Sequence, residues 1–206
     1  MASVEKIARE NVWNIIRHNE RLNHNYSNSD VDLKRKNLDY LLTPDRGMSS
    51  YDYYKQRLSE CYVYGRSDVK TVFSWVITCP EDVPEDQTDL FFYNCYDFLN
   101  ERYGGEKNCI SCSVHKDESG RPHMHYLGMP IVEDKKHGGE KVCCNDVINR
   151  KDLRNFHPDL DRYLKNNGVK GSVYTGITQK QGGNRSIREL KQEREVQRTR
   201  QQERRW

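Results

Sequence analysis

Hydrophobic residues recur at helical intervals in four stretches of the chain. Apolar side chains spaced three and four residues apart predict helices over residues 4–22, 49–61, 88–103 and 151–167. The start of the first helix is open, because residues 3–7 fit a short strand equally well. The pattern therefore predicts that helices make up a large part of the chain.

Strands are predicted between these helices. Residues 69–79 are dense in β-branched and aromatic side chains and stop at a proline, which is typical of a buried central strand. Residues 109–115 alternate between two faces, and residues 123–132 follow a polar, glycine-containing tip as the returning strand of an antiparallel hairpin. A last short strand is expected within residues 168–178. The mixture of strands and helices predicts an α+β fold, a central sheet with helices packed on it.

Composition narrows the class of protein only a little. The formal net charge is +3, and residues 188–205 form a basic stripe that could follow phosphates or simply be a solvated charged helix. The 13 tyrosines supply rings that can fill a core or stack on bases. No apolar run is long enough to span a bilayer and no signal peptide opens the chain, so a cytoplasmic protein with mostly reduced cysteines is expected.

The sharpest chemical feature is a group of three histidines in the predicted hairpin. His123 and His125 are two residues apart on one strand, so both imidazoles point to the same face, about 6.6 Å apart along the chain. His115 ends the preceding strand and can approach the same point from there. Three neutral imidazoles that leave coordination positions open are typical of a catalytic metal site. The alternative is a set of hydrogen-bonded polar residues on a sheet face.

Two acids and a second histidine-containing pair extend this candidate site. Asp117 or Glu118 could accept the second ring N–H of a metal-bound histidine, or both could solvate the hairpin tip. His18 and Arg21 are three residues apart on the first predicted helix and are therefore surface neighbours. A guanidinium disfavours the imidazolium and can bind a phosphate oxygen, so the pair could supply a neutral nucleophile. A solvent-facing polar helix end is the alternative.

Most of the chain resembles the relaxase domain of the MobV (Mob/Pre, plasmid recombination enzyme) family, within the HUH endonucleases. Three blocks carry the resemblance: residues 18–21 (His-Asn-Glu-Arg), residues 38–41, and residues 115–125, which are similar to the family's H-x-D-E-x-x-P-H-x-H. The second block is the weakest, because Asp39 and Leu41 stand where the family usually has asparagine and an acidic residue, and we assign it no role. The hairpin tip is one residue longer than the family pattern, which leaves the strand parity of the last two histidines unchanged.

The resemblance implies a central antiparallel sheet of about five strands with helices packed on it. It also implies a metal-dependent DNA relaxase, which nicks one strand at an origin of transfer and stays covalently attached to the 5′-phosphate for conjugative mobilisation. One divalent cation, Mn²⁺ or Mg²⁺, is expected. The resemblance implies that His18, Arg21 and Glu118 are catalytic and that His18 is the nucleophile. It implies that His115, His123 and His125 bind the cation and that Asp117 hydrogen-bonds to one of these ligands. Arg21, Arg66 and Arg185 are the implied contacts to DNA.

The resemblance further implies how the chain is organised and what it binds. Residues 1–186 are expected to form the nicking domain, and residues 187–206 a charged helical extension that leads into a C-terminal region. Single-stranded or hairpin DNA at an origin of transfer is the expected partner, together with the conjugation machinery and a second copy of the chain joined through the C-terminal region. A bacterial cytoplasmic location is expected.

Several alternatives stay open from the sequence. The chain could be a rolling-circle replication initiator, a transposase-type nuclease, or a DNA-binding module of the same fold without catalysis. Tyr26 and Tyr40 are the fallback nucleophiles, since tyrosine does this work in other HUH enzymes. A structural zinc site at Cys109 and Cys112 is disfavoured, because residues three apart on a strand face opposite ways.

Overall fold

A computed structural model describes residues 2–23, 31–118, 120–136 and 138–174. The chain divides into two compact units, Met1–Val173 and Tyr174–Trp206, and the architecture that follows is that of the first. The expected domain boundary after residue 186, Arg185 and Tyr26 lie outside the described residues. The strand expected within residues 168–178 is absent from its described part, residues 168–174.

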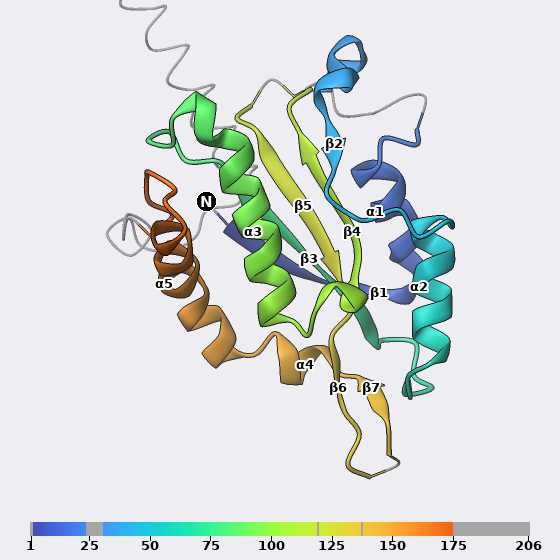
Figure 1. Ribbon diagram of the computed structural model, residues 1–206. Coiled ribbons are helices and arrows are strands. Elements are labelled where there is room, and N and C mark those ends of the chain that lie inside the picture. The colour runs from blue at the N-terminus through green and yellow to red at the C-terminus, as the bar shows by residue number, and fades with distance from the viewer. Residues whose placement is uncertain (1, 24–30, 119, 137, 175–206) are drawn as a thin grey trace, which may run out of the picture. The chain divides into compact units, whose positions relative to one another are not determined.

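A five-stranded antiparallel sheet forms the centre of this unit (Figure 1). The strands follow the order β1-β3-β5-β4-β2, so β5 is the middle strand, and every neighbouring pair is antiparallel. A separate two-stranded ribbon, β6–β7, projects at one end (Figure 1). The predicted α+β architecture is confirmed. The strands are β1 Ala2–Ala8, β2 Tyr40–Leu41, β3 Lys70–Thr78, β4 Cys109–His115, β5 His123–Gly128, β6 Ile131–Glu133 and β7 Glu140–Val142.

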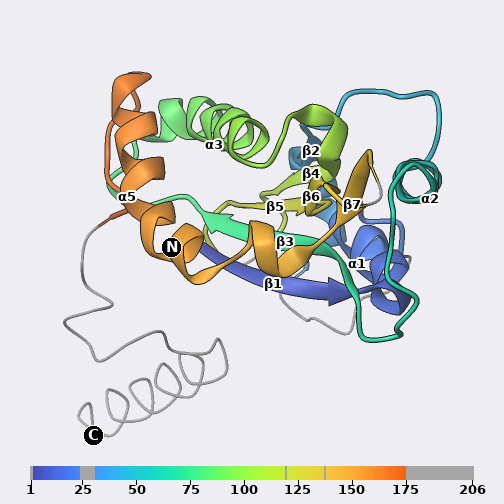
Figure 2. The same cartoon turned by 90° about the horizontal axis from the view of Figure 1, so that it is seen from below.

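Helices cover both faces of the sheet: α3 and α1 lie on opposite sides of it (Figure 2). Side-chain caps begin two of the helices, because Ser49 accepts a hydrogen bond from the backbone N–H of Asp52 and Asn149 accepts two in the same way. None of the described helices is long and apolar enough to cross a membrane. The helices are α1 Val12–Asn19, α2 Ser50–Ser59, α3 Thr88–Arg102, α4 Cys144–Val147 and α5 Arg150–Asn166, with a 3₁₀ helix at Leu33–Leu38.

The two faces of the sheet bury cores of different size. The larger core lies under α3 and α5, where Trp75 stacks on Phe156 with 3.6 Å between ring centroids and donates its indole N–H to Tyr103. The smaller core lies under α1 and α2 and includes Ile16 and Tyr54. It covers only part of its face, and the rest of that face carries the histidines.

The structure decides the open start of the first helix and shortens one predicted strand. Residues 2–8 form the edge strand β1 and the helix begins only at Val12, so the strand alternative for this segment is confirmed. The strand β5 ends at Gly128, where a Cβ atom would lie 2.5 Å from the ring of Phe73, and Pro130 separates it from β6. The hairpin itself, β4 with β5, is confirmed.

A β-bulge in β4 corrects the argument about the two cysteines. The register between β4 and β5 shifts between Cys109 and Ser111, which changes the parity of the strand. Cys109 and Cys112 therefore both lie in the larger core, while Ile110 joins the smaller one. The prediction that the two cysteines face opposite ways is wrong, because period-two alternation does not include bulges.

Candidate active site

The hairpin of β4 and β5 brings the three predicted histidines together. His115 pairs with His123 across the two strands, and His125 pairs with Ser113, so all three imidazoles lie on one face. Their ring centroids are 4.6 Å apart for His115 and His125, 4.9 Å for His123 and His125, and 5.4 Å for His115 and His123. Rings this close can direct one nitrogen each to a common point.

Backbone carbonyls fix which ring nitrogen of His115 and of His123 faces that point. Nε2 of His115 lies 2.7 Å from the carbonyl oxygen of Asn19, and Nδ1 of His123 lies 3.1 Å from that of Arg121. Since a carbonyl only accepts, these nitrogens carry the hydrogens, and the opposite nitrogens keep their lone pairs. Among the described residues, Nδ1 of His115 and Nε2 of His125 are buried without a hydrogen-bond partner. This donor set fits a metal ion.

Burial favours the neutral form, which a metal requires, in His115 and His125. Desolvation is the largest cause that lowers the pKa of His115, the Asn19 hydrogen bond opposes it, the charge of Arg21 adds to it, and the pKa falls to about 3. Desolvation also lowers the pKa of His125 well below its usual range. Neutral imidazoles are ready to coordinate without first releasing a proton.

The end of α1 places His18 beside this cluster. Val12 and Ile16 anchor the inner face of the helix in the smaller core, and His18 lies in its last turn. The ring centroid of His18 is 5.5 Å from that of His125 and 5.9 Å from that of His115. One nitrogen of each of these three histidines lies within 4.8 Å of the other two. Desolvation, followed by the charge of Arg21, lowers the pKa of His18, as the sequence argument expected.

Arg21 is buried in a cluster of carboxylates. Its guanidinium forks onto Asp117, with distances of 2.6 and 2.9 Å, and also contacts Glu118 at 2.9 Å and Asp39 at 3.4 Å. Burial alone would lower the pKa of Arg21, but hydrogen bonds to Asp117 and Glu118 outweigh it and raise the pKa. The residue is 3% exposed and has a φ of 53°, a left-handed conformation that is uncommon outside glycine. Arg21 is therefore built into the interior, where carboxylates neutralise its charge, and its expected contact with a DNA phosphate stays a prediction.

The two acids of the hairpin tip differ in what they contact. Asp117 is fully buried and both of its carboxylate oxygens bind Arg21, so the expected bond from Asp117 to a metal-bound imidazole is replaced by one to the guanidinium. Glu118 bridges Arg21 and the histidines: its oxygens lie 4.0 Å from Nδ1 of His115 and 3.8 Å from Nε2 of His123. These two histidines and Glu118 form a second group with metal-ligand spacing.

Asp39 belongs to the site, although the sequence assigned it no role. One oxygen of Asp39 accepts hydrogen bonds from the backbone N–H groups of Lys116 and Asp117, at 2.7 and 3.0 Å. The other contacts Arg21. Burial raises the pKa of Asp39, and the neighbouring charge of Asp117 adds to that effect. Asp39 thus fixes the start of the hairpin tip, and its place in a block matching the family was the signal that could have identified it.

Asn19 and Glu20 were also missed, although they lie between the two residues that the sequence singled out. The carbonyl of Asn19 orients His115, and Glu20 accepts a hydrogen bond from the hydroxyl of Ser111 at 2.7 Å on the same sheet face. Each residue of the His-Asn-Glu-Arg segment therefore contacts the hairpin or its histidines. Every residue type has a backbone carbonyl, so the identity of Asn19 could not predict its contact with His115. Only the motif as a whole could have indicated that this segment belongs to the site.

Other predicted residues lie away from the histidines. Arg66 is on an exposed loop before β3, paired with Asp68 at 3.3 Å, whereas His123 pairs with Thr78 at the far end of that strand. Tyr40 packs on the opposite side of the sheet, where its hydroxyl donates to Asp89 on α3 at 2.7 Å. The position of Tyr40 removes it as a fallback nucleophile, and Tyr26 lies outside the described residues.

The cysteine zinc site that the sequence left open finds no support in the described part of the chain. Cys109 and Cys112 are buried as free thiols in the larger core, and burial raises the pKa of Cys109 to about 12. A thiol must lose its proton to bind zinc, which this environment opposes.

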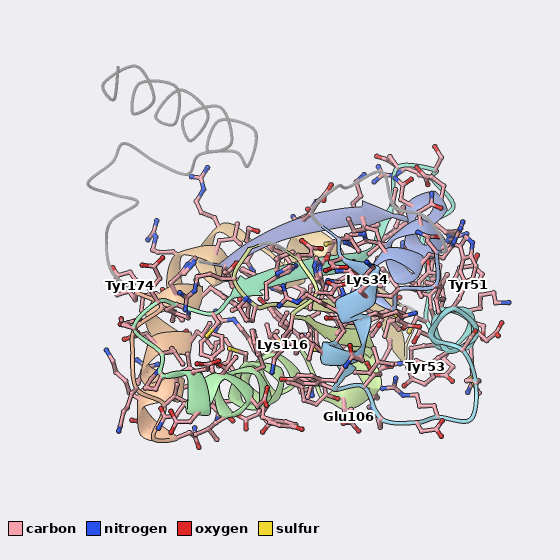
Figure 3. All side chains as sticks on the ribbon, turned by 90° about the horizontal axis from the view of Figure 1, so that it is seen from above. Lys34, Tyr51, Tyr53, Glu106, Lys116 and Tyr174 are labelled. Atoms are coloured by element: carbon pink, nitrogen blue, oxygen red, sulfur yellow. The ribbon has the colours of Figure 1, made fainter. Side chains whose placement is uncertain are left out.

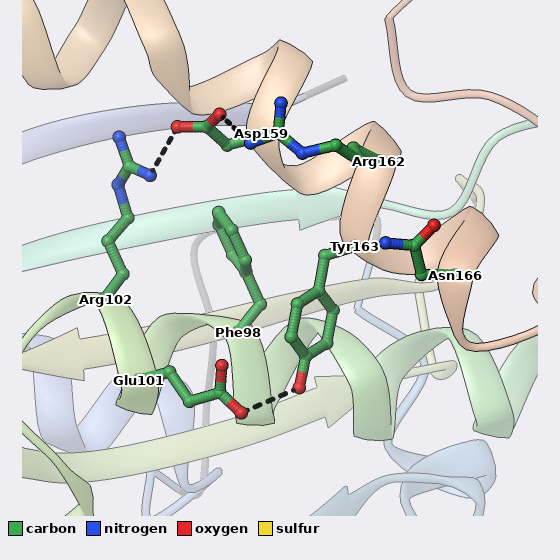
Figure 4. Close-up of a pocket in the computed structure, with 7 residues that line it drawn as sticks. All are labelled: Phe98, Glu101, Arg102, Asp159, Arg162, Tyr163 and Asn166. Atoms are coloured by element: carbon green, nitrogen blue, oxygen red, sulfur yellow. Dashed lines mark hydrogen bonds and ion pairs between the residues drawn. The ribbon is translucent and has the colours of Figure 1, made fainter.

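A separate surface pocket lies between α3 and α5 (Figure 4). Its polar groups are paired with one another, since Arg102 binds Asp159 at 3.0 Å and Tyr163 donates to Glu101 at 3.1 Å. It is on the face of the sheet opposite to the histidines. This pairing joins the two helices and leaves the pocket without a group suited to chemistry.

The fold and the site together define a class of protein. An antiparallel sheet whose hairpin presents three imidazoles, with a fourth from a helix end, is the arrangement expected of a relaxase domain. The chain belongs to the plasmid recombination enzyme (Mob/Pre) family, whose model matches residues 1–202.

Known relatives agree with this assignment. The chain is 32% identical to a plasmid recombination enzyme of Streptococcus agalactiae, over 82% of this chain and 34% of the relative. It is 31% identical to one from Lactiplantibacillus plantarum, over 95% of this chain and 54% of the relative. The chain thus spans about half or less of the length of these two relatives.

Solved structures are similar along most of the chain. A Mn-bound MobM relaxase domain of the MOBV class, in complex with plasmid pMV158 oriT DNA, matches with a TM-score of 0.74 and 28% identity over 93% of this chain and 98% of that one. A second complex, whose DNA carries a 3′-thiophosphate, matches with a TM-score of 0.73 and 29% identity over 93% of this chain and 97% of that one. The expected relaxase fold is confirmed.

Proposed function

We propose that this chain is the nicking domain of a relaxase, which cuts one strand at an origin of transfer and forms a covalent link to it through His18. The observation that carries the proposal is the neutral imidazole of His18, held at ligand distance from His115 and His125 on a separate structural element. The family membership and the DNA-bound relatives support it.

The residues that would hold a divalent cation are His115, His123 and His125. Glu118 stands near two of them and is a candidate for a further contact. Charge supports this assignment: Asp39, Asp117 and Glu118 carry three formal negative charges beside the single positive charge of Arg21. A divalent cation beside three neutral imidazoles would balance the remaining two. Mn²⁺ is the first choice because the similar relaxase structures are Mn-bound, and Mg²⁺ is the alternative.

The chemical step follows from the state of His18. A nitrogen lone pair of the neutral ring attacks the phosphorus, a P–N bond forms, and the bond from phosphorus to the 3′ oxygen breaks. The proton on the other ring nitrogen balances the charge of the leaving 3′ oxygen, which becomes a hydroxyl. A bound divalent cation would draw negative charge from the phosphate and orient it. The product is a phosphoramidate with a 5′-linked strand, which can be rejoined by reversal.

Arg21 and Glu118 serve this step from inside the protein. Arg21 holds the hairpin tip through Asp117 and Glu118, and its charge adds to the effect of burial in lowering the pKa of His18. Glu118 is the carboxylate that can take up or return a proton at the edge of the cluster. Arg66 and Arg185 remain proposed contacts to DNA, and residues 1–186 and 187–206 remain the proposed domain and extension. Single-stranded or hairpin DNA, a second copy of the chain and the conjugation machinery remain the proposed partners.

A covalent-capture experiment tests the proposal without knowledge of the target sequence. The chain is incubated with Mn²⁺ and a pool of single-stranded oligonucleotides with a randomised centre, and adducts that survive denaturing electrophoresis are mapped by peptide mass spectrometry. We expect one adduct, on the peptide that contains His18. His18→Ala should abolish it, while His157→Ala, a histidine on α5, should leave it intact.

Metal affinity separates the roles of the histidines. Titration of Mn²⁺, followed by electron paramagnetic resonance, should show weak or no binding in His125→Ala and near-normal binding in His18→Ala. An adduct on a tyrosine peptide would refute the role of His18. Binding of DNA without any adduct in the unmodified chain would favour a non-catalytic module of the same fold.

A further inference from the structure

A surface strip of aromatic and basic side chains, some exposed and some half-buried, runs along α1 and α2. Trp13 on α1 is 42% exposed, and its ring lies 5.1 Å from that of Tyr51 on α2. Figure 3 looks along α2 and shows Tyr51 on the side of the helix toward α1, with Tyr53 on another side near Glu106. The exposed part of the Trp13 ring offers a flat apolar surface on which another ring can stack.

Cations flank these rings. The guanidinium of Arg17 lies 6.0 Å from the ring centroid of Trp13, and the ammonium of Lys55 lies 5.2 Å from that of Tyr51. Arg9 lies in a 3₁₀ turn, Arg9–Asn11, that precedes α1, and Trp13 and Arg17 are four residues apart on α1, which is about one helical turn. The segment therefore presents a guanidinium, an indole ring and a second guanidinium in succession along the chain.

The strip ends in a surface pocket of about 450 Å³ at the start of α1. Tyr51 and Arg9 line it together with Tyr64 and Arg66 from the loop before β3. Tyr64 is 43% exposed. We define the α1–α2 strip by these residues: Arg9, Trp13, Arg17, Tyr51, Tyr64 and Arg66.

The α1–α2 strip carries a net positive charge once the charges that are paired with one another are left out. The acids nearby are Glu10, which lines the pocket, Asp52, which is paired with Lys55 at 2.7 Å, and Asp68, which is paired with Arg66. Arg9 and Arg17 form no ion pair with any residue in the described ranges. Two guanidiniums without an ion pair in the described ranges, beside the exposed ring of Trp13 and the half-buried ring of Tyr51, are complementary to a polyanion that also carries flat apolar groups.

The strip is connected to the candidate active site through α1. The helix starts where β1 meets the beginning of β3 and ends at the hairpin histidines, because Ala8 pairs with Lys70 while His18 lies beside His125. Arg17 directly precedes His18. One end of the strip is therefore next to the candidate nucleophile, and the pocket is at the other end of the helix.

We infer that the α1–α2 strip binds single-stranded DNA, with bases stacked on Trp13 and Tyr51 and phosphates on Arg9 and Arg17. Aromatic rings bind any base by stacking, and basic side chains follow the backbone, which is how proteins hold single strands without reading their sequence. Duplex DNA hides its base faces and cannot use the rings. The inference rests on the proposed function and gives the strand that enters the site a path along α1.

Binding of an oligothymidylate of twelve residues, in EDTA so that no cleavage occurs, tests the strip separately from the chemistry. Fluorescence anisotropy of the labelled oligonucleotide should show at least fivefold weaker binding to Trp13→Ala. Tyr93→Ala is the matched control, since Tyr93 is 54% exposed on α3, across the sheet, and should bind normally. Arg17→Gln should lower the slope of log affinity against log salt concentration by about 0.7, while Arg154→Gln on α5 should not.

Direct contact and specificity complete the test. The fluorescence of Trp13, taken as the difference between the unmodified chain and Trp13→Phe, should be quenched by the oligonucleotide. Equal affinity of Trp13→Ala and the unmodified chain, or equal binding of a duplex of the same length, would overturn the inference, as would no binding at all. Adduct formation by Trp13→Ala should recover at saturating DNA, so loss of the strip and loss of the nicking function give different results.

Discussion

Removal of the buried guanidinium of Arg21 should destabilise the protein more than any change on its surface. In Arg21→Ala, the carboxylate of Asp117 would stay fully buried without the two hydrogen bonds, of 2.6 and 2.9 Å, that now neutralise it. Breaking a buried pair by deleting one partner costs about 3–5 kcal/mol, because the remaining charge is left uncompensated. Glu118 and Asp39 lose the same partner, which places the expected loss in the upper part of this range.

Urea unfolding followed by far-ultraviolet circular dichroism, in EDTA, measures this loss. The free energy of unfolding of Arg21→Lys should lie between those of the unmodified chain and Arg21→Ala. An ammonium keeps the charge but cannot fork onto two carboxylates. Arg21→Gly should be less unstable than Arg21→Ala by about 1 kcal/mol, since glycine adopts the φ of 53° without strain. Lys55→Ala, which removes an exposed ion pair, should show no resolvable change.

Two results would refute this reasoning. If Arg21→Ala unfolded within about 1 kcal/mol of the unmodified chain, the carboxylate cluster would not depend on the guanidinium. If Arg21→Ala were stable and only DNA binding were lost, Arg21 would be a phosphate contact after all.

Three further predictions concern the histidines and Asp39. Replacing His115 by alanine should abolish Mn²⁺ binding measured by isothermal titration calorimetry, and normal binding by that variant would exclude it as a ligand. The metal-free protein should lose stability as the pH falls from about 6.5 toward 3: the folded state holds the pKa of His115 at about 3, so the unfolded state takes up the proton first, at about 1.4 kcal/mol per pH unit for each such histidine. A pH-independent midpoint of urea unfolding over this range would contradict it, and His115→Ala should flatten the dependence. Asp39→Asn should keep or raise the melting temperature. An amide oxygen still accepts hydrogen bonds from the N–H groups of Lys116 and Asp117, while the cost of burying a carboxylate disappears. A drop of many degrees would show that the charge of Arg21 needs the negative charge of Asp39.

The sequence predicted the parts of the fold that depend on local periodicity. The helices α2, α3 and α5 and the hairpin of β4 and β5 follow from spacing alone, and the placement of His115, His123 and His125 on one face follows from strand parity. The boundary between β1 and α1 was left open, because seven residues can satisfy both periods.

What the sequence could not supply depends on contacts between distant segments. The pairing of Arg21 with Asp117 joins residues 96 apart in the chain, and nothing in their neighbourhoods selects that partner over a phosphate. The bulge at Ile110 is a local change of backbone that residue types do not announce. The carbonyl of Asn19 is common to every residue, so its contact with His115 could be found only in three dimensions.

The contact between Asn19 and His115 has a consequence for transplanting this chemistry. A hairpin grafted alone onto another sheet would carry three imidazoles, but without that carbonyl the hydrogen of His115 could reside on either nitrogen. The smallest portable unit is therefore the hairpin together with the tetrapeptide that starts at His18. His18, the proposed nucleophile, and Asn19, whose carbonyl orients His115, are adjacent in the chain, so any graft that keeps one keeps the other beside it.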